Sequence, residues 1–303
     1  MGIARIADAQ QYSFIIGRSG ELQLELARLR EQIASGVKLT RPQDDPAGAA
    51  RVVRFDASLA ALAQHREASG FGTDVLSAED AALKDAHDVL VRAEEIATQQ
   101  ASGTLSADER AAAAEEVRGL LDALTQVGNT ELSGRRVFAG LALDAAAPFA
   151  DPPDDLNTYN PAAAYTGSQQ EFEVKTGSTA TERVRITTRG DTIFQPGLQA
   201  LHDLWRTLDT NGDVPATLAG LKAARETVSA ERASVGARQA QLVGRADVVT
   251  GLEVTDEAAR ARVRDADLVA TVASLAQAEN ALQALLAASG RFAQTSLVQL
   301  LQI

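Results

Sequence analysis

Two adjacent aspartates, Asp44 and Asp45, are the residues whose types and spacing most readily suggest chemistry. Such a pair could hold a cation or serve as an acid/base dyad. Asp45, however, is a favoured helix N-cap residue, and Pro46 suits the first helical position. We therefore predict that Asp44, Asp45 and Pro46 form a turn that leads into a helix and separates two parts of the chain.

Other possible ligands and nucleophiles are scattered. The sequence has no cysteine, and no group of histidines and carboxylates has metal-ligand spacing. An aspartate-rich loop lacks the glycine and the final glutamate of an EF-hand, and no phosphate-binding glycine loop is present. The sequence therefore predicts a protein that is not an enzyme and needs no cofactor or metal. The residues considered are His65, His87 and His202, and Asp151, Asp154 and Asp155.

Composition limits the partners. The 303 residues carry a formal net charge of −12, which disfavours nucleic acid and anionic membranes. Polar residues interrupt every apolar run that could reach the length of a membrane span, so we expect no membrane insertion. Residues 1–11 lack the continuous apolar core of a cleaved secretory signal.

The C-terminal stretch, Leu268 to Ile303, contains only two charged side chains, Glu279 and Arg291. A helix with so little charge has to be buried against other protein surfaces. Its apolar residues recur at heptad spacing, as in a coiled coil. The two heptad sets are Leu268, Leu275, Leu282, Ser289 and Ser296, and Val272, Glu279, Leu286, Ala293 and Leu300.

The N-terminal stretch has a matching pattern. Ile15, Leu22 and Leu29 repeat at seven residues, with Ser19, Leu26 and Ile33 between them, and Leu24 adds an apolar side chain. We expect a helix from about Asp8 to Ser35, ended by Gly36. Two such helices at opposite ends of one chain predict a terminal pair; ordinary bundle helices are the alternative. The predicted assembly residues are Ile15, Leu22, Leu26, Leu29, Ile33, Leu268, Val272, Leu275, Leu282, Leu286, Leu297 and Leu300.

Between the termini the pattern is mainly helical. Long helices are expected from Pro46 to about Ser102, weakest at Gly70 and Gly72, and then from a Ser106/Glu109 capping box to about Asn129. A short strand is expected near residues 134–140, strands at 171–175 and 182–186, and helices again at 198–208 and 215–252.

The resulting fold class is mainly α, a long helical bundle with paired terminal coiled-coil helices and a small, mostly β insert. We expect residues 1–42 and 262–303 to form the terminal coiled coil, 43–140 and 200–261 a helical rod, and 141–199 the insert, facing outward.

Several stretches together resemble the bacterial flagellin family. The segment Ser35–Gly48, which contains Asp44-Asp45-Pro46, is similar to the N-terminal signature of that family, and Thr104–Arg110 is similar to its mid-chain capping stretch. Within the family, other segments look like the members that form the hook–filament junction. These segments are Ser133–Gly140, Tyr165–Gly167, Gly190–Phe194 and Ala293–Leu301. The resemblance spans the chain except for about residues 141–165.

The resemblance implies a structural flagellar protein that assembles with identical subunits through its terminal helices. It also implies contacts with the first hook-associated junction protein and with flagellin. Export without a cleaved signal, through the flagellar type III apparatus, and a cytoplasmic chaperone at the C-terminal helix are implied as well. A filament-forming flagellin is the alternative within the family, and a soluble helical binding domain the more distant one.

Overall fold

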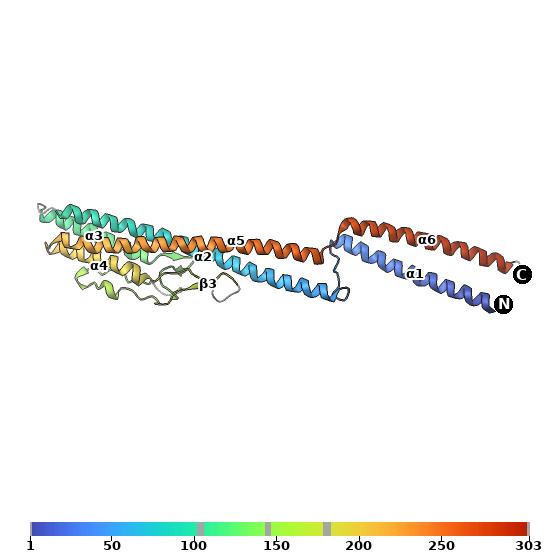
Figure 1. Ribbon diagram of the computed structural model, residues 1–303. Helices are drawn as coiled ribbons and strands as arrows, with labels where there is room; N and C mark the ends of the chain where they lie inside the picture. The colour runs from blue at the N-terminus through green and yellow to red at the C-terminus, as the bar shows by residue number, and fades with distance from the viewer. Residues whose placement is uncertain (1, 102–105, 143–146, 178–182, 302–303) are drawn as a thin grey trace. The chain divides into compact units, whose positions relative to one another are not determined.

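A computed structural model describes residues 2–101, 106–142, 147–177 and 183–301, except for the side chains at 2–9, 11–12 and 292–301. Six long helices dominate it, joined by short 3₁₀ turns and two small sheets (Figure 1). The helices are α1 Gly2–Ser35, α2 Pro46–Gln100, α3 Ala107–Gly128, α4 Gly190–Asp209, α5 Leu218–Arg264 and α6 Leu268–Leu301. The strands are β1 Glu131–Leu132, β2 Arg135–Arg136, β3 Glu173–Lys175 and β4 Arg183–Arg185.

The chain forms two compact units. One contains residues 1–60 and 253–303, and the other contains residues 61–252. Both boundaries lie inside long helices, α2 and α5, and not in loops. The division into terminal coiled coil, rod and insert therefore stays a prediction about how the chain is organised for assembly.

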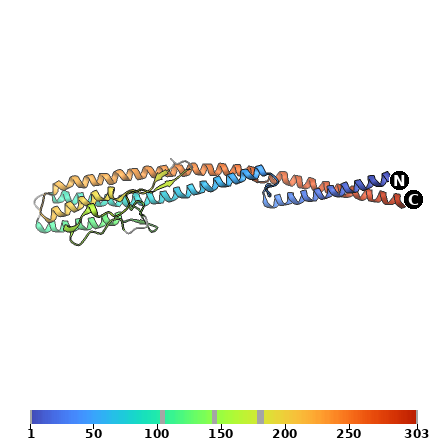
Figure 2. The same cartoon turned by 90° about the horizontal axis from the view of Figure 1, so that it is seen from below.

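In the first unit, α1 and α6 lie side by side and run antiparallel (Figures 1 and 2). Helix α1 ends where the sequence predicts, at Ser35, with Gly36 in the left-handed region at φ 70°. The next residues bind the other end of the chain: the Lys38 amide donates to the Arg264 carbonyl at 2.8 Å, and the Ala266 amide to the Gly36 carbonyl at 2.9 Å. The connection after α1 is thus tied to the connection between α5 and α6, at one end of the helix pair.

The second unit has one apolar core, to which α2, α3, α4 and α5 contribute. Polar pairs follow the line where α2 meets α5: Arg225 Nε donates to Glu94 Oε1 at 2.7 Å, and Arg232 Nε to Asp80 Oδ1 at 3.1 Å. Three phenylalanines, Phe138, Phe149 and Phe194, are fully buried where the strands and loops meet the helices. Their rings pack edge to face, with centroids 4.7 Å apart for Phe138–Phe194 and 5.6 Å for Phe149–Phe194.

Helix α2 is continuous through the two glycines where the sequence suggests a weak point. Gly72 has a packing reason. A Cβ there would come within 2.9 Å of a Leu242 methyl group and 3.0 Å of an Ile186 methyl group. The glycine lets α5 and the chain after β4 approach α2 closely, so it supports the packing instead of breaking the helix.

The capping box at the start of α3 is confirmed. The Ser106 hydroxyl accepts from the Glu109 amide at 3.3 Å, and the Glu109 carboxylate accepts from the Ser106 amide at 2.7 Å. Residues 104 and 105, at the start of the predicted capping stretch, lie outside the described part of the chain.

Several predicted boundaries are wrong. Helix α4 begins at Gly190, before the predicted Leu198, and α5 continues to Arg264, beyond the predicted Leu252. The charged residues at the end of α5 are good helix formers, and one of them has a partner on α2: Arg260 Nη1 donates to Asp56 Oδ1 at 2.9 Å. Helix α1 begins at Gly2, earlier than the predicted Asp8.

The strands are shorter than predicted. The expected strand at 134–140 is a two-residue arm of a hairpin, in which Leu132 pairs with Arg135 and Glu131 with Arg136. The second hairpin pairs β3 with β4 in antiparallel register, with Val174 opposite Val184. The chain between the hairpins is mostly loop, with 3₁₀ turns at Leu156–Thr158 and Pro161–Ala163. Backbone bonds to side chains, such as Asn129 with both polar groups of the Phe149 backbone, replace ladder bonds there.

Candidate assembly surface

The inner face of α1 is the predicted one. Leu22 and Leu26 are buried, at 6% and 5% exposure, and Ile15, Leu29 and Ile33 are half-buried on the same heptad face. The heptad spacing places these residues along one line, which faces α6. Leu24, expected to add an apolar contact, points away and is 75% exposed.

The inner face of α6 is only partly the predicted one. Leu275 and Leu282, from the first heptad set, are half-buried as expected. The second inward set is not Val272, Glu279 and Leu286 but the positions one residue earlier, where Thr271 and Ala278 are buried at 8% and 7% exposure. Small side chains at these positions allow α1 to approach closely. Glu279 then lies at the edge of the pair, where its Oε1 accepts from Arg30 Nη2 of α1 at 2.9 Å.

Val272 and Leu286 of the displaced set, together with Leu268 of the first set, form an apolar strip on one side of α6, which we call the lateral strip. Spacings of 4 and 14 residues keep the three on one side of a helix. They are 49%, 51% and 54% exposed. The predicted assembly residues thus fall into two groups, one that pairs α1 with α6 and one that faces outward.

Further exposed apolar side chains were not predicted. Val269 is 83% exposed beside the lateral strip, and Phe14 and Ile16 on α1 are 69% and 68% exposed. The sequence signal was present, because these residues are apolar yet fall outside the heptad positions. Two predicted residues, Leu297 and Leu300, have side chains outside the described part of the structure.

A helix starts directly after the predicted turn, and the role of the turn between two parts of the chain stays a prediction. Pro46 is the first residue of α2, and Asp45 Oδ1 accepts from the Gly48 amide at 2.8 Å. Asp44 lies 3.9 Å from Arg28 Nη2. With Asp45 occupied as a cap and Asp44 beside an arginine, the pair has the arrangement of a structural turn and not of a proton-transferring dyad.

An open groove of about 440 Å³ lies beside this turn. Lys38, Arg51 and Arg262 line it with Asp45, so three cations face one carboxylate, and Phe55 forms part of the wall. Lys38 Nζ donates to the Arg262 carbonyl at 2.9 Å, which ties the linker after α1 to the end of α5. The groove provides positive charge but no acid–base pair.

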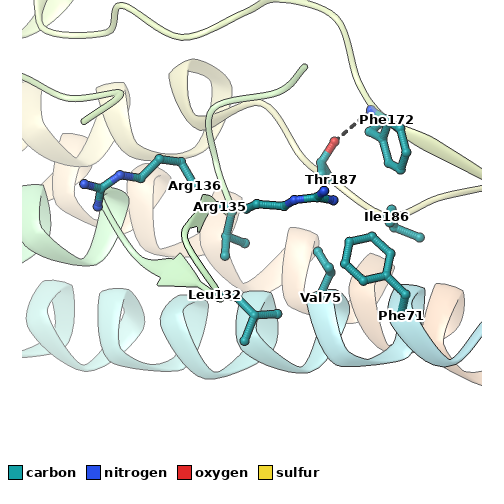
Figure 3. A pocket seen from close by; sticks show the side chains of 9 residues that line it. Phe71, Val75, Leu132, Arg135, Arg136, Phe172, Ile186 and Thr187 are labelled. Carbon is teal, nitrogen blue, oxygen red and sulfur yellow. Dashed lines mark hydrogen bonds between the residues drawn. The ribbon is translucent and has the colours of Figure 1, made fainter. Parts of the chain in front are cut away.

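A second, smaller cavity lies in the other unit, between α2, the β1–β2 hairpin and the chain around β3 and β4 (Figure 3). Its volume is about 20 Å³, room for a water molecule but not for an organic ligand. The Arg135 guanidinium lies 5.5 Å from the centroid of the Phe71 ring, and the Thr187 hydroxyl accepts from the Phe172 amide at 2.8 Å. The cavity is therefore a small gap in the packing at the wall of the core, and these contacts hold the residues around it in place.

His202 and Asp155, which were also considered for chemistry, have structural partners. His202 Nε2 is 3.0 Å from the Leu156 carbonyl oxygen, and Asp155 caps a 3₁₀ turn by accepting from the Asn157 amide at 3.0 Å. Among the residues that the structure describes, no three histidines, cysteines or carboxylates are grouped so that they could hold a metal ion. A search of the same residues finds no helix with the length and hydropathy needed to cross a membrane.

Comparison with known proteins agrees with this geometry. Residues 18–142 match the model of the bacterial flagellin N-terminal helical region. Flagellar hook-associated protein 3 of Salmonella typhimurium is 32% identical over 143 residues, which cover 47% of this chain and 45% of that protein. The aligned part is therefore less than half of that relative's length.

Two solved structures share the fold. A putative flagellar hook-associated protein from Vibrio parahaemolyticus superposes with a TM-score of 0.64 at 15% identity, over 73% of this chain and all of that one. The flagellar junction protein FlgL from Legionella pneumophila gives 0.55 at 13% identity, over 71% and 99%. The fold is thus a mainly α, flagellin-like one, with helices from both termini paired. Residues 18–142 are thus similar to the N-terminal helical region of bacterial flagellins, and the chain is similar over part of its length to a flagellar hook-associated protein.

Proposed function

We propose that this protein is a structural component of the bacterial flagellum that forms the junction between hook and filament. The observation that carries the proposal is the lateral strip: a helix pair made from both chain ends leaves Leu268, Val272 and Leu286 about half exposed. The similarity to hook-associated protein 3 supports the junction over other positions in the flagellum.

In this proposal, identical subunits associate through their terminal helices. The residues between α1 and α6 hold each pair together, and the lateral strip packs against the pair of a neighbouring subunit. Burial of exposed apolar surface is the driving force for such association. The turn at Asp44, Asp45 and Pro46 sets the direction in which the helix pair leaves the rest of the chain.

The proposed partners follow from this position. They are the first hook-associated junction protein on one side and flagellin on the other. Export without a cleaved signal and a cytoplasmic chaperone at the C-terminal helix belong to the same proposal. A chaperone would cover the apolar surface of α6 before assembly, because exposed patches of this kind cause aggregation. No catalytic activity is part of the proposal.

A filament-forming flagellin is the second candidate, because the matched N-terminal region is described for bacterial flagellins in general. The two candidates differ in the number of subunits. A junction protein forms a limited layer at the end of the hook, and a flagellin forms the whole filament. A soluble helical binding domain is the third candidate, and it predicts no attachment to flagella.

Immunogold labelling of flagella from the source bacterium distinguishes the three. We expect gold only where hook and filament meet, and loss of attached filaments when the gene is deleted. Label along the filament would replace the junction by the flagellin proposal. Intact, unlabelled flagella in both strains would overturn both flagellar functions.

A further inference from the structure

The second unit contains a buried carboxyl group that the assembly function does not use. Glu79, on α2, is fully buried at 0% exposure. Among the described residues, no donor makes a hydrogen bond to either of its carboxylate oxygens. Burying a charged carboxylate that accepts no hydrogen bonds costs free energy, so this environment favours the protonated, neutral form of Glu79.

Charged groups from α5 and β4 lie near Glu79. From α5, Arg238 Nη2 lies 3.9 Å from Glu79 Oε2, and Glu231 lies beside it. Arg185 of β4 and Glu171, just before β3, complete the cluster, with Arg185 Nη1 donating to Glu171 Oε1 at 2.7 Å. On α2 itself, the neighbouring Asp80 pairs outward with Arg232.

The hydrogen bonds of this cluster are directed to Glu231 and not to Glu79. Arg238 Nη2 makes a short hydrogen bond to Glu231 Oε1, and the Thr188 hydroxyl donates to the same oxygen at 2.9 Å. Arg238 Nη2 also donates to the Thr188 hydroxyl at 3.0 Å. These bonds fasten the chain that follows β4 to α5.

With Glu171 counted through its ion pair with Arg185, the charges of the cluster balance only when Glu79 is protonated. Two arginines, Arg185 and Arg238, then face two carboxylates, Glu171 and Glu231. Ionisation of Glu79 adds a third negative charge inside the cluster without a third cation. Burial raises the pKa of Glu79 from 4.5 to about 7, and the positive charges of Arg238 and Arg185 offset only part of this effect.

The raised pKa of Glu79 makes the stability of the folded protein depend on pH. The folded protein holds the Glu79 proton more tightly than the unfolded chain does. The contribution of Glu79 to stability is therefore complete below about pH 4.5 and is lost as the pH rises through about 7.

We propose that Glu79 is a pH-operated lock on the segment around β3 and β4, here called the hairpin arm (residues 171–177 and 183–188). When Glu79 is protonated, the arm is bound to α2 and α5 by a charge-balanced cluster. When Glu79 loses its proton, its charge has no compensating cation and is more stable in contact with water. The arm therefore detaches more often, because the carboxylate is hydrated only when the arm is open. The lock is independent of the terminal helices and of the proposed assembly.

Hydrogen exchange of the full-length monomer at pH 6.0 and 8.5 tests the lock, read on peptides of the hairpin arm after correction for the intrinsic pH dependence of exchange. With pKa values near 7 in the closed arm and 4.5 in the open arm, the opening constant should rise about tenfold between the two pH values. Glu79→Gln keeps the shape and removes the titration, so its opening constant should be flat. Glu226→Gln, at an exposed position on α5, is the matched control and should behave as the wild type.

Two results would overturn the lock: an opening constant in the wild type that does not change with pH, or an equal rise in Glu79→Gln. If that variant does not fold, carbon-13 NMR of the wild-type Glu79 carboxyl decides instead. A titration midpoint near 7 supports the lock, and one near 4.5 refutes it.

Discussion

Val272 and Leu275 lie within one turn of α6 but face different surroundings. Val272, on the lateral strip, is 51% exposed, and Leu275 is half-buried against α1. An aspartate at position 272 should leave the monomer almost unchanged, within about 0.5 kcal/mol, because surface substitutions of this kind have small effects. An aspartate at 275 should weaken the α1–α6 pair itself.

The effect of Val272→Asp on assembly can be estimated. Full burial of such a side chain is worth about 1.5–3 kcal/mol, so the exposed half offers about 0.8–1.5 kcal/mol per subunit. The aspartate removes this gain, and burying its charge adds a penalty of several kcal/mol. Each 1.4 kcal/mol is a factor of ten in affinity, so we expect association to weaken by at least about 100-fold.

The assay is complementation of a deletion strain of the source bacterium. The wild-type protein should restore attached filaments and swimming. Val272→Asp should be exported at normal levels but accumulate in the medium, because it cannot stay in the assembly. Gln277→Asp adds the same charge at an exposed position of α6 outside the lateral strip, and it should assemble.

Normal assembly of Val272→Asp would refute the role of the lateral strip. So would equal failure of Gln277→Asp, because the defect would then come from added charge anywhere on α6. The chain has no cysteine, so Val272→Cys offers an independent check. It should form cross-links between subunits in assembled flagella and none in the dilute monomer.

Four further outcomes are expected. In the purified monomer, residues 1–40 and 265–303 should exchange amide hydrogens much faster than the second unit, because an isolated helix pair buries too little surface to offset the entropy of ordering; equal protection would contradict assembly-coupled folding. Ser106→Ala should lower the free energy of unfolding by about 0.5–2 kcal/mol in a urea titration, through loss of the cap. Gly140→Ala should destabilise by more than about 1 kcal/mol in the same titration, because φ is 64° and a Cβ would lie 2.5 Å from two backbone carbonyl oxygens. Glu79→Gln should gain up to about 3 kcal/mol over the wild type between pH 5 and pH 9, the value of a pKa shift from 4.5 to about 7.

Interactions between residues close in the sequence were enough to predict much of the fold. The left-handed glycine that ends α1, the Asp45 cap before Pro46 and the capping box of α3 depend on neighbours within a few residues. The period of the apolar residues also identified the inner face of α1. These features are readable from sequence because the interacting groups are close along the chain.

The hairpins and the helix ends were harder to predict from the sequence. Two- and three-residue strands carry almost no alternating pattern, and their positions depend on core residues such as Phe149 and Phe194, which lie far apart in the sequence. The part of α5 past Leu252 contacts a residue about 200 positions earlier, because Arg260 pairs with Asp56. The two residues of such a contact never lie in the same short stretch of sequence, so the sequence pattern around either residue does not predict the contact.

The sequence alone therefore determined that both termini are heptad helices, that the chain is mainly helical and that it resembles flagellins. Only the tertiary structure decided which apolar residues of α6 face α1, because Leu268, Val272 and Leu286 belong to the same heptad pattern as Leu275 and Leu282, which pair inward. The structure also decided that Glu79 is buried among charges from α5 and the hairpin arm. Periodicity gives the face of a helix, but the register against a partner and the burial of a charge depend on residues distant in the sequence.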